Sequence, residues 1–283
     1  MLKLNNKKNE RLIKKTIDNL KLAGKSNSTI RNYDYALKRF FERCNYRGNL
    51  KKFNEDDFLN YIKTEFIEKG KSTNTYNMEI AAIKKMFLVN FRKTFINDLI
   101  PIAKTPKRLP VIVPKSEFID FFNSEKSIKH KCWLILSYCS GLRAYEVATI
   151  RIEDIHSNEK YITVIGKGNK ERRTYLPPIV VKILRIYYRV SNMTKRTGYL
   201  FEGNKCKEHI SPRTVVNYFT SLSNINERYT FHSLRHSFAT YFLMSGCDIH
   251  DLQLMLGHSD ISTTYMYVHM CVNFQKIGGN YGK

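Results

Sequence analysis

Residues 231–269 read FHSLRHSFATYFLMSGCDIHDLQLMLGHSDISTTYMYVH. Near the start of this stretch, His232 and Arg235 are three positions apart, so both lie on one face of a helix that we predict over residues 233–244. The opposite face of the helix is apolar and consists of Phe231, Leu234, Phe238, Tyr241 and Phe242. This pattern predicts a packed helix that presents a histidine and an arginine to a cleft.

The second half of the stretch places another histidine beside two tyrosines. His258 lies in a tight glycine turn between predicted helices over residues 249–256 and 262–269. Tyr265 and Tyr267 lie on the second of these helices, where two residues correspond to about 200° of rotation. Both tyrosines therefore cannot face one cleft, and the periodicity alone leaves open which of them does.

Two upstream motifs add cationic side chains. Arg143 directly precedes a predicted helix that begins near Ala144, where a guanidinium and free backbone N–H groups together suit a phosphate. The alternative is a surface ion pair with Glu146. Lys167 lies in a glycine-flanked turn, from which a long side chain can reach a substrate, and Lys170 is its rival.

Together, two arginines, a lysine, histidines and a tyrosine predict a phosphoryl-transfer site that needs neither a metal ion nor a cofactor. The arginines would hold the phosphate, the lysine and histidines would move protons, and the tyrosine would attack. His236 adjoins Arg235 and is interpreted as structural. A metal nuclease is an alternative, but no carboxylates cluster beside the histidines that it would use. These are His232, His236, His258 and His269.

The charge of the chain indicates its partner. Its 283 residues include 48 Lys and Arg against 25 Asp and Glu, a net charge of +23. Self-repulsion on this scale favours a polyanionic partner, although a lysine-rich solvated surface is the alternative. Six scattered cysteines without a Cys-x-x-Cys pair indicate a reducing compartment, and no segment approaches the ~20 apolar residues that span a bilayer. We therefore expect a cytoplasmic protein that binds double-stranded DNA and no membrane.

Helical periodicity and proline spacing divide the chain. Residues 1–102 are predicted to form an N-terminal helical DNA-binding domain of four amphipathic helices, of which Ser28 and Asn54 cap the second and third. The fourth begins near Ser72. Residues 103–115 contain three prolines and four basic residues without an acid, which predicts a basic Pro-rich linker between domains.

The remaining residues, 116–283, are predicted to form the catalytic domain with its C-terminal tail. This domain is mostly helical, with one β-hairpin from residues 161–165 and 172–176. The fold class is therefore mainly α with a small β-hairpin or sheet. Basic residues on the polar helix faces, in the linker and on the returning strand are the predicted DNA contacts. These are Arg31, Lys38, Lys71, Lys84, Lys107, Arg108, Arg172 and Arg173.

These motifs, in this order, resemble the tyrosine recombinase (phage integrase) family, and most closely its short two-domain members, the Xer recombinases. The resemblance covers about residues 113–269 and is strongest over residues 256–269, LGHSDISTTYMYVH. Residues 28–40 resemble the family's N-terminal core-binding (SAM-like) domain with lower specificity. The implied architecture is a SAM-like helical domain followed by a tyrosine recombinase catalytic domain.

The resemblance implies a role for each motif. The two catalytic arginines, the hairpin lysine, the two histidines and the nucleophile match Arg143, Lys167, His232, Arg235, His258 and Tyr267. The offset from His258 selects Tyr267 rather than Tyr265 as the nucleophile. His232 would assist proton removal from it, and Glu146 matches an acidic position that would be a structural partner.

The implied reaction is site-specific recombination, in which DNA is cut and rejoined through a 3′-phosphotyrosyl intermediate while Lys167 protonates the leaving 5′ oxygen. It would serve chromosome or plasmid dimer resolution, or integration and excision of a mobile element. The implied partner is double-stranded DNA with a specific recombination site, and the implied synaptic complex is a homo-tetramer, or one in which the chain is paired with a homologous recombinase. The need for an accessory protein stays open.

Two alternative functions and the packing of the C-terminal tail also stay open. A type IB topoisomerase-like relaxation activity and a non-catalytic DNA-binding regulator are the alternative functions. The apolar tail at residues 270–277 is predicted to dock on a neighbouring subunit, with packing on its own domain as the alternative.

Overall fold

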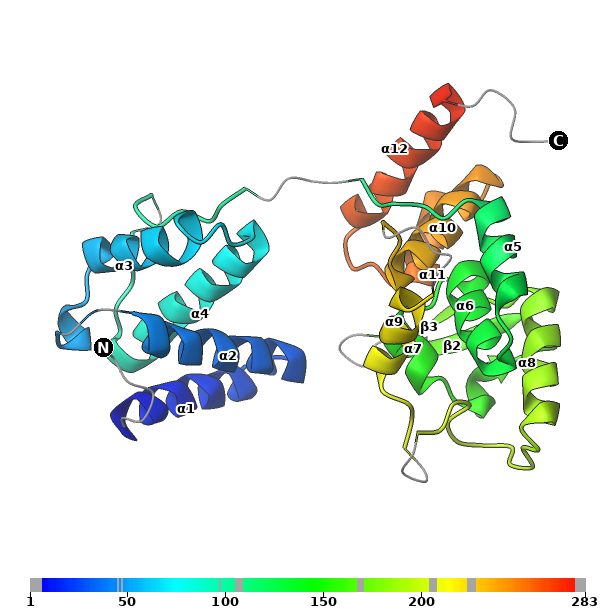
Figure 1. Ribbon diagram of the computed structural model, residues 1–283, viewed down its shortest axis with the longest axis horizontal. Coiled ribbons are helices and arrows are strands. Elements are labelled where there is room, and N and C mark those ends of the chain that lie inside the picture. The colour runs from blue at the N-terminus through cyan, green and yellow to red at the C-terminus, as the bar shows by residue number, and fades with distance from the viewer. Residues whose placement is uncertain are drawn as a thin grey trace. The chain divides into compact units, whose positions relative to one another are not determined.

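The computed structural model forms two units, Met1–Lys107 and Arg108–Lys283 (Figure 1). Side chains are described up to residue 271. The structure describes residues 7–44, 46, 48–96, 98–104, 109–166, 171–203, 208–222 and 228–277. None of the helices within these ranges is long and apolar enough to cross a membrane.

The first unit is helical, as predicted. Its elements are α1 (Lys7–Leu22), α2 (Asn27–Arg43), the 3₁₀ turn η1 (Leu50–Lys52), α3 (Glu55–Ile62), the π-helical turn η2 (Lys63–Ile67) and α4 (Thr73–Phe91). Asn54 is an N-cap as predicted, and Ser72, near which the fourth helix was predicted to begin, caps α4. Their side chains accept backbone N–H groups that a helix start leaves unpaired. The predicted cap Ser28 was wrong: Ser26 caps α2, and its hydroxyl accepts from the backbone N–H of Thr29 at 3.3 Å.

The core of this unit is aromatic. Phe40 packs edge-on against Phe41, Phe53 and Tyr61, with ring centroids 5.1 to 5.8 Å apart. Phe53 in turn stacks on Phe87 at 5.0 Å, which joins α2 to α4 through the segment before α3. Each such pair adds about 0.5–1.5 kcal/mol to the burial of its surface.

A buried carboxylate completes this core. The side chain of Glu79 on α4 is fully buried and accepts hydrogen bonds from the Arg39 guanidinium and the Tyr61 hydroxyl. The hydroxyl and most of the guanidinium are also removed from water, since the Arg39 side chain is 11% exposed. The charge of each ionic group is costly to bury, and the pairing of Glu79 with Arg39 and the Tyr61 hydroxyl offsets that cost.

The second unit is mainly helical with a small sheet, as predicted. Its elements are α5 (Lys115–Ser124), α6 (Ile128–Ser140), α7 (Ala144–Thr149), the 3₁₀ turn η3 (Ile152–Asp154), β1 (Ile155–His156), β2 (Tyr161–Ile165), β3 (Glu171–Tyr175), α8 (Pro178–Val190), α9 (Pro212–Thr220), α10 (Phe231–Met244), α11 (Ile249–Leu256) and α12 (Ser262–Ile277). The strands form one antiparallel sheet in the order β1-β2-β3. The two-residue strand β1 was not predicted.

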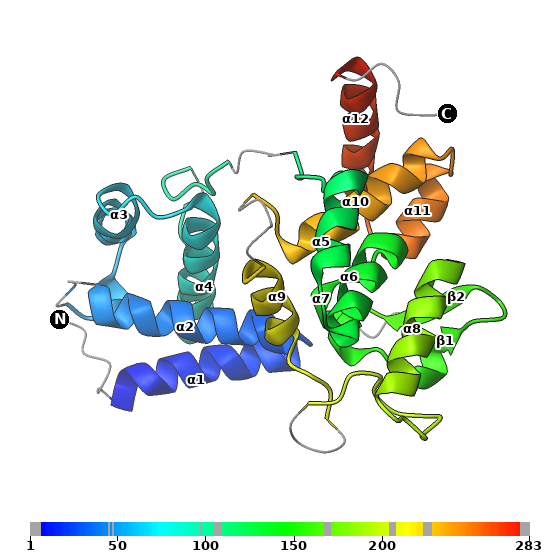
Figure 2. The ribbon, with the colours of Figure 1, turned by 45° about the vertical axis from the view of Figure 1, so that its right-hand side comes forward.

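Helix α6 is the centre of this unit. Its residues 132–136 are all buried, whichever side of the helix they occupy, which is the pattern of a helix surrounded by protein. It packs against α8 on one side and α10 on the other (Figure 2). Residues 112 and 113, at the end of the predicted linker, are also buried here, and the Val113 N–H donates to Ser237 Oγ on α10 at 2.8 Å.

We expect Glu79→Ala to lower the free energy of unfolding by ~3–5 kcal/mol, because it leaves the buried Arg39 guanidinium and Tyr61 hydroxyl without their acceptor. Urea denaturation of the full chain, compared with the wild type, measures the change. The exposed Glu68 provides the matched control, and Glu68→Ala should stay within about 0.5 kcal/mol of the wild type. Equal effects of the two substitutions would contradict the prediction.

Candidate active site

Arg235 on α10 lies at the centre of the second unit. Its side chain is 1% exposed, and its two terminal nitrogens donate to the carbonyls of Gly141 at 2.6 Å and Leu256 at 2.5 Å. These carbonyls lie at the ends of α6 and α11, so one guanidinium joins three helices. Burial lowers the pKa of Arg235 to about 9, which still leaves it a cation at neutral pH.

Two glycines make this arrangement possible. Gly141 and Gly257 end α6 and α11 with φ of +70° and +64°, a left-handed conformation that other residues adopt at a cost. A Cβ at Gly141 would lie 2.4 Å from Phe238, and one at Gly257 would lie 2.7 Å from the Arg172 side chain. Both helix ends therefore need glycine to approach their neighbours.

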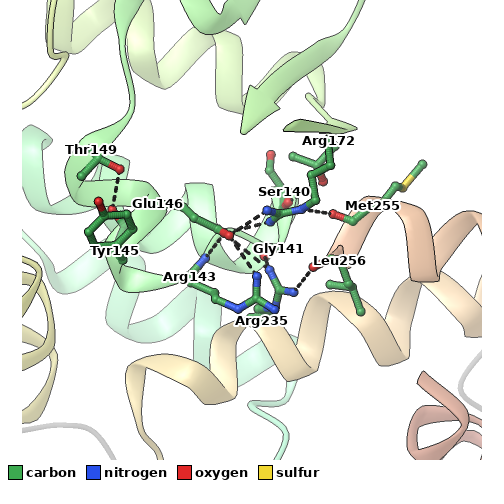
Figure 3. Close-up of polar contacts among 11 residues, drawn as sticks. Ser140, Gly141, Arg143, Tyr145, Glu146, Thr149, Arg172, Arg235, Met255 and Leu256 are labelled. Atoms are coloured by element: carbon green, nitrogen blue, oxygen red, sulfur yellow. Dashed lines mark hydrogen bonds and ion pairs between the residues drawn. The ribbon is translucent and has the colours of Figure 1, made fainter. Parts of the chain in front are cut away.

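The carboxylate of Glu146 on α7 gathers three guanidinium groups (Figure 3). Arg172 binds it through two parallel hydrogen bonds of 2.7 and 2.8 Å, and Arg143 through its backbone N–H at 2.7 Å and its side chain at 3.0 Å. Arg235 forms an ion pair with it at 3.5 Å. Burial alone would raise the pKa of Glu146, but the hydrogen bonds and positive charges bring it down to about 2.

Arg172, which the sequence predicted as a DNA contact, lies mostly inside the protein. Its side chain is 8% exposed, and besides the two bonds to Glu146 it donates through Nε to the Met255 carbonyl at 2.6 Å. The guanidinium of this β3 residue thus ties the sheet to α7 and to the end of α11. Because it is buried in this ion pair, we assign Arg172 to the support of the site.

Tyr267 on α12 is 1% exposed, whereas Tyr265 is 49% exposed. The Tyr267 hydroxyl lies 2.9 Å from Nδ1 of His236 on α10. Burial raises the pKa of Tyr267, while the charges of Arg235 and Arg143 act in the opposite direction. The residue is therefore a protonated phenol inside the unit, within the influence of both arginines.

His258 lies on the same side of the site as Tyr267. Their rings are nearly parallel, at 11°, with centroids 6.4 Å apart. His258 Nδ1 lies 3.0 Å from the Thr264 hydroxyl, and the Gln253 side chain donates to the His258 carbonyl at 3.0 Å. Burial and the nearby Arg235 lower the pKa of His258 to about 4, so it is neutral at physiological pH.

The pair His232 and His236 is the main difference from the sequence analysis. The sequence predicted that His232 would assist the tyrosine and that His236 was structural, yet it is His236 that contacts the Tyr267 hydroxyl. The two rings meet edge to face at 4.5 Å, as residues four positions apart on a helix do. That spacing already indicated that His236 shares the face of His232.

Several predicted residues lie outside the described part of the chain. They are Lys167, its rival Lys170, and the linker residues Lys107 and Arg108. Cations that the structure does describe near the site are the three arginines around Glu146. In the described ranges, no group of three or more His, Cys, Asp and Glu side chains is placed to hold a metal ion.

The predicted DNA contacts of the first unit have different surroundings. Arg31 and Lys38 are exposed on α2, and Lys38 forms an ion pair of 2.7 Å with Asp34. Lys71 binds the buried carboxylate of Glu65, which is 1% exposed.

The last two predicted contacts lie on α4 and β3. Lys84 on α4 donates to the Ile100 carbonyl at 2.8 Å. In the second unit, Arg173 is exposed and covers the ring of Tyr161 at 4.6 Å. DNA contact by these residues stays a prediction.

Comparison with known proteins identifies the family. Residues 115–273 match the phage integrase family, and residues 12–92 match its N-terminal SAM-like domain. The chain therefore belongs to the phage integrase family, as the resemblance of its motifs predicted, and it is a site-specific tyrosine recombinase with the two implied domains.

Relatives of known name cover most of the chain. It is 32% identical over 268 residues to the tyrosine recombinase XerA of Pyrococcus furiosus, which covers 91% of this chain and 88% of the relative. It is 30% identical over 270 residues to the tyrosine recombinase XerD of Halalkalibacterium halodurans, and this match covers 87% of this chain and 88% of the relative. Among solved structures, XerH bound to its palindromic difH substrate in a post-cleavage complex has the same fold, with a TM-score of 0.69, 21% identity, and coverage of 88% and 78%.

We expect Glu146→Gln to destabilise the second unit by ~3–5 kcal/mol at pH 7, because it leaves buried guanidinium groups without their counter-charge. The pKa of Glu146 is lowered from 4.5 to about 2, so its stabilisation is complete above pH 4.5 and is lost as the pH falls toward 2. Urea denaturation between pH 2 and pH 7 should therefore show a smaller acid loss in Glu146→Gln than in the wild type. Glu171→Gln, at an exposed carboxylate of β3, is the control.

Proposed function

We propose that this recombinase cuts DNA by attack of the Tyr267 hydroxyl on a scissile phosphodiester, forming a 3′-phosphotyrosyl bond and releasing a 5′ hydroxyl. The observation that carries the proposal is the buried phenol of Tyr267 beside Arg235, with Tyr265 turned to solvent. The phosphotyrosyl bond keeps the energy of the broken phosphodiester. Rejoining by the 5′ hydroxyl therefore needs no ATP.

The arginines and His258 would stabilise the transition state. Arg143 is at the start of α7 and Arg235 is fixed by its two carbonyl contacts, so both guanidinium groups are oriented before DNA arrives. Those contacts use two of the five N–H donors that an arginine carries. Donors held in place in a buried site lower the barrier because they need no reorganisation when charge gathers on the phosphate. His258 would donate a further hydrogen bond to the same phosphate.

His232 would assist removal of the proton from Tyr267, and Lys167 would protonate the leaving 5′ oxygen. Lys167 and its rival Lys170 both fall between β2 and β3 in the sequence, and the resemblance to the family favours Lys167 as this acid. A protonated 5′ hydroxyl is a far better leaving group than an alkoxide. The acid and the nucleophile thus act on opposite sides of the phosphorus.

The assembly that we propose is a tetramer on two copies of one DNA site. Exchange of both strands between two duplexes needs four cuts, and each chain supplies one nucleophile. The palindromic substrate of the structurally similar XerH supports paired sites. The N-terminal unit, the linker cations Lys107 and Arg108, and the exposed Arg31 would bind the phosphate backbone.

The same assembly would provide a docking surface for the C-terminal tail. The end of α12 would dock on a neighbouring subunit beyond Met270, which is itself buried in its own unit. A reaction on chromosomal or plasmid DNA would take place in the cytoplasm.

The relatives of this chain that are named as tyrosine recombinases favour recombination over topoisomerase-like relaxation. Resolution of DNA dimers and integration or excision of a mobile element share these steps.

Tyr267→Phe should bind its DNA site with unchanged affinity but form no covalent adduct, because only the attacking oxygen is removed. The site is first recovered by sequencing the DNA trapped covalently on the wild-type chain in cells. Adduct formation on a nicked duplex of that sequence is then read on a denaturing gel. Tyr265→Phe is the matched control, since Tyr265 is exposed, and should form adduct like the wild type. An undiminished adduct in Tyr267→Phe would refute the nucleophile.

Lys167→Ala should slow cleavage of ordinary DNA by about 10²–10⁴-fold, the usual contribution of a general acid. A substrate with a sulfur atom at the 5′ leaving position should restore the rate, because a thiolate leaves without protonation. Lys170→Ala, treated in the same way, is the comparison. If this substrate restored the cleavage rate only in Lys170→Ala, Lys170 rather than Lys167 would be the general acid.

A further inference from the structure

The hydrogen bond between Tyr267 and His236 involves the atom that attacks the DNA. His236 Nδ1 lies 2.9 Å from the Tyr267 hydroxyl, which is within the range of a good O–H···N contact. The hydroxyl is buried, and the ring of His236 lies at 5.7 Å from the tyrosine ring. A general base must lie within hydrogen-bond reach of the proton that it removes, and His236 meets this condition without any movement.

The surroundings of His236 hold its ring in the neutral form. The groups that face it are His232 and Arg235 on its own helix, His258 from the turn after α11, and Tyr267 from α12. Burial, followed by the charges of the two histidines and the arginine, lowers the pKa of His236 to about 3. A neutral ring whose proton is on Nε2 has a free lone pair on Nδ1, so the phenol donates to it.

We propose that His236 is a catalytic residue of this recombinase and accepts the Tyr267 proton during strand cleavage. In this step the Oη–H proton moves to His236 Nδ1 as the bond from Oη to phosphorus forms. The bond from phosphorus to the 5′ oxygen breaks, and that oxygen takes a proton from the general acid. On rejoining, the imidazolium returns its proton to the departing phenol. The inference rests on the proposed function, because it requires Tyr267 to be the nucleophile.

The same arrangement couples the base to the arrival of DNA. Without DNA, burial together with the charges of His232 and Arg235 makes His236 a weak base, and burial keeps the phenol protonated. A phosphate bound between Arg143 and Arg235 would offset the charge of Arg235 and raise the pKa of His236. The tyrosine would then lose its proton only when a phosphodiester is in place.

The decisive variant is His236→Asn, because the asparagine oxygen can take the position of Nδ1 and accept the hydrogen bond but cannot take up the proton. We expect it to bind the recovered site as the wild type does and to form adduct about 10²–10⁴-fold more slowly. The wild-type rate should rise with pH and then level off as His236 loses its proton in the complex. In His236→Asn the rate should instead climb about tenfold per pH unit throughout, since hydroxide alone removes the phenolic proton.

The probe is the nicked duplex carrying the recovered site, and single-turnover adduct formation is measured from pH 5.5 to pH 9. His236→Leu, which lacks both the acceptor and the base, should be at least as slow as His236→Asn. Wild-type rates in His236→Asn with slow cleavage in His236→Leu would show that the residue only orients the tyrosine, and would overturn the proposal. Wild-type rates in both variants would overturn it as well.

Tyr267→Phe separates this inference from the proposed function. If that variant still forms adduct, the nucleophile itself is wrong. If it forms none while His236→Asn cleaves at the wild-type rate with the wild-type pH profile, only the role of His236 is wrong. Retained binding of the duplex by each variant shows that the site is folded.

Discussion

The catalytic unit depends on the buried carboxylate of Glu146. A single carboxylate lies among three guanidinium groups, and those of Arg172 and Arg235, which are buried, would be costly to bury alone. Through them it connects α7, β3 and α10, which lie far apart in the sequence. Arg235 then extends the connection to the ends of α6 and α11 through two backbone carbonyls. Loss of this one negative charge would therefore disturb both the packing of the unit and the orientation of Arg143 and Arg235, which we propose to hold the phosphate.

The same cluster determines the protonation of the site. Its charges and its burial keep His236 and His258 neutral, while burial keeps Tyr267 protonated. Three guanidinium groups around one carboxylate leave the site with positive charge that is compensated only in part. In the mechanism that we propose, an anionic phosphodiester would supply the missing charge, and its binding would activate the nucleophile because it changes the field at both histidines.

The N-terminal unit uses its charges differently. Glu79 and Glu65 are buried carboxylates whose positive partners come from neighbouring helices, so part of the basic charge stabilises the fold. Lys71 illustrates this, because its ammonium group binds Glu65, while its predicted contact with DNA stays a prediction. A net charge of +23 indicates a polyanionic partner, but it does not say which cations reach it.

The sequence by itself determined the helical character of both units, the hairpin, the family and the positions that match its catalytic residues, but it did not predict α5 or the central helix α6. Local periodicity and capping carry this information, as the cap at Asn54 shows. Tertiary structure alone decided that Arg172 is a buried support, because its contact with Met255 joins residues 83 positions apart. It also decided that His236, rather than its neighbour on the same face, meets Tyr267, across 31 positions. Helical spacing says which residues share a face, whereas the partner of that face depends on how distant helices pack.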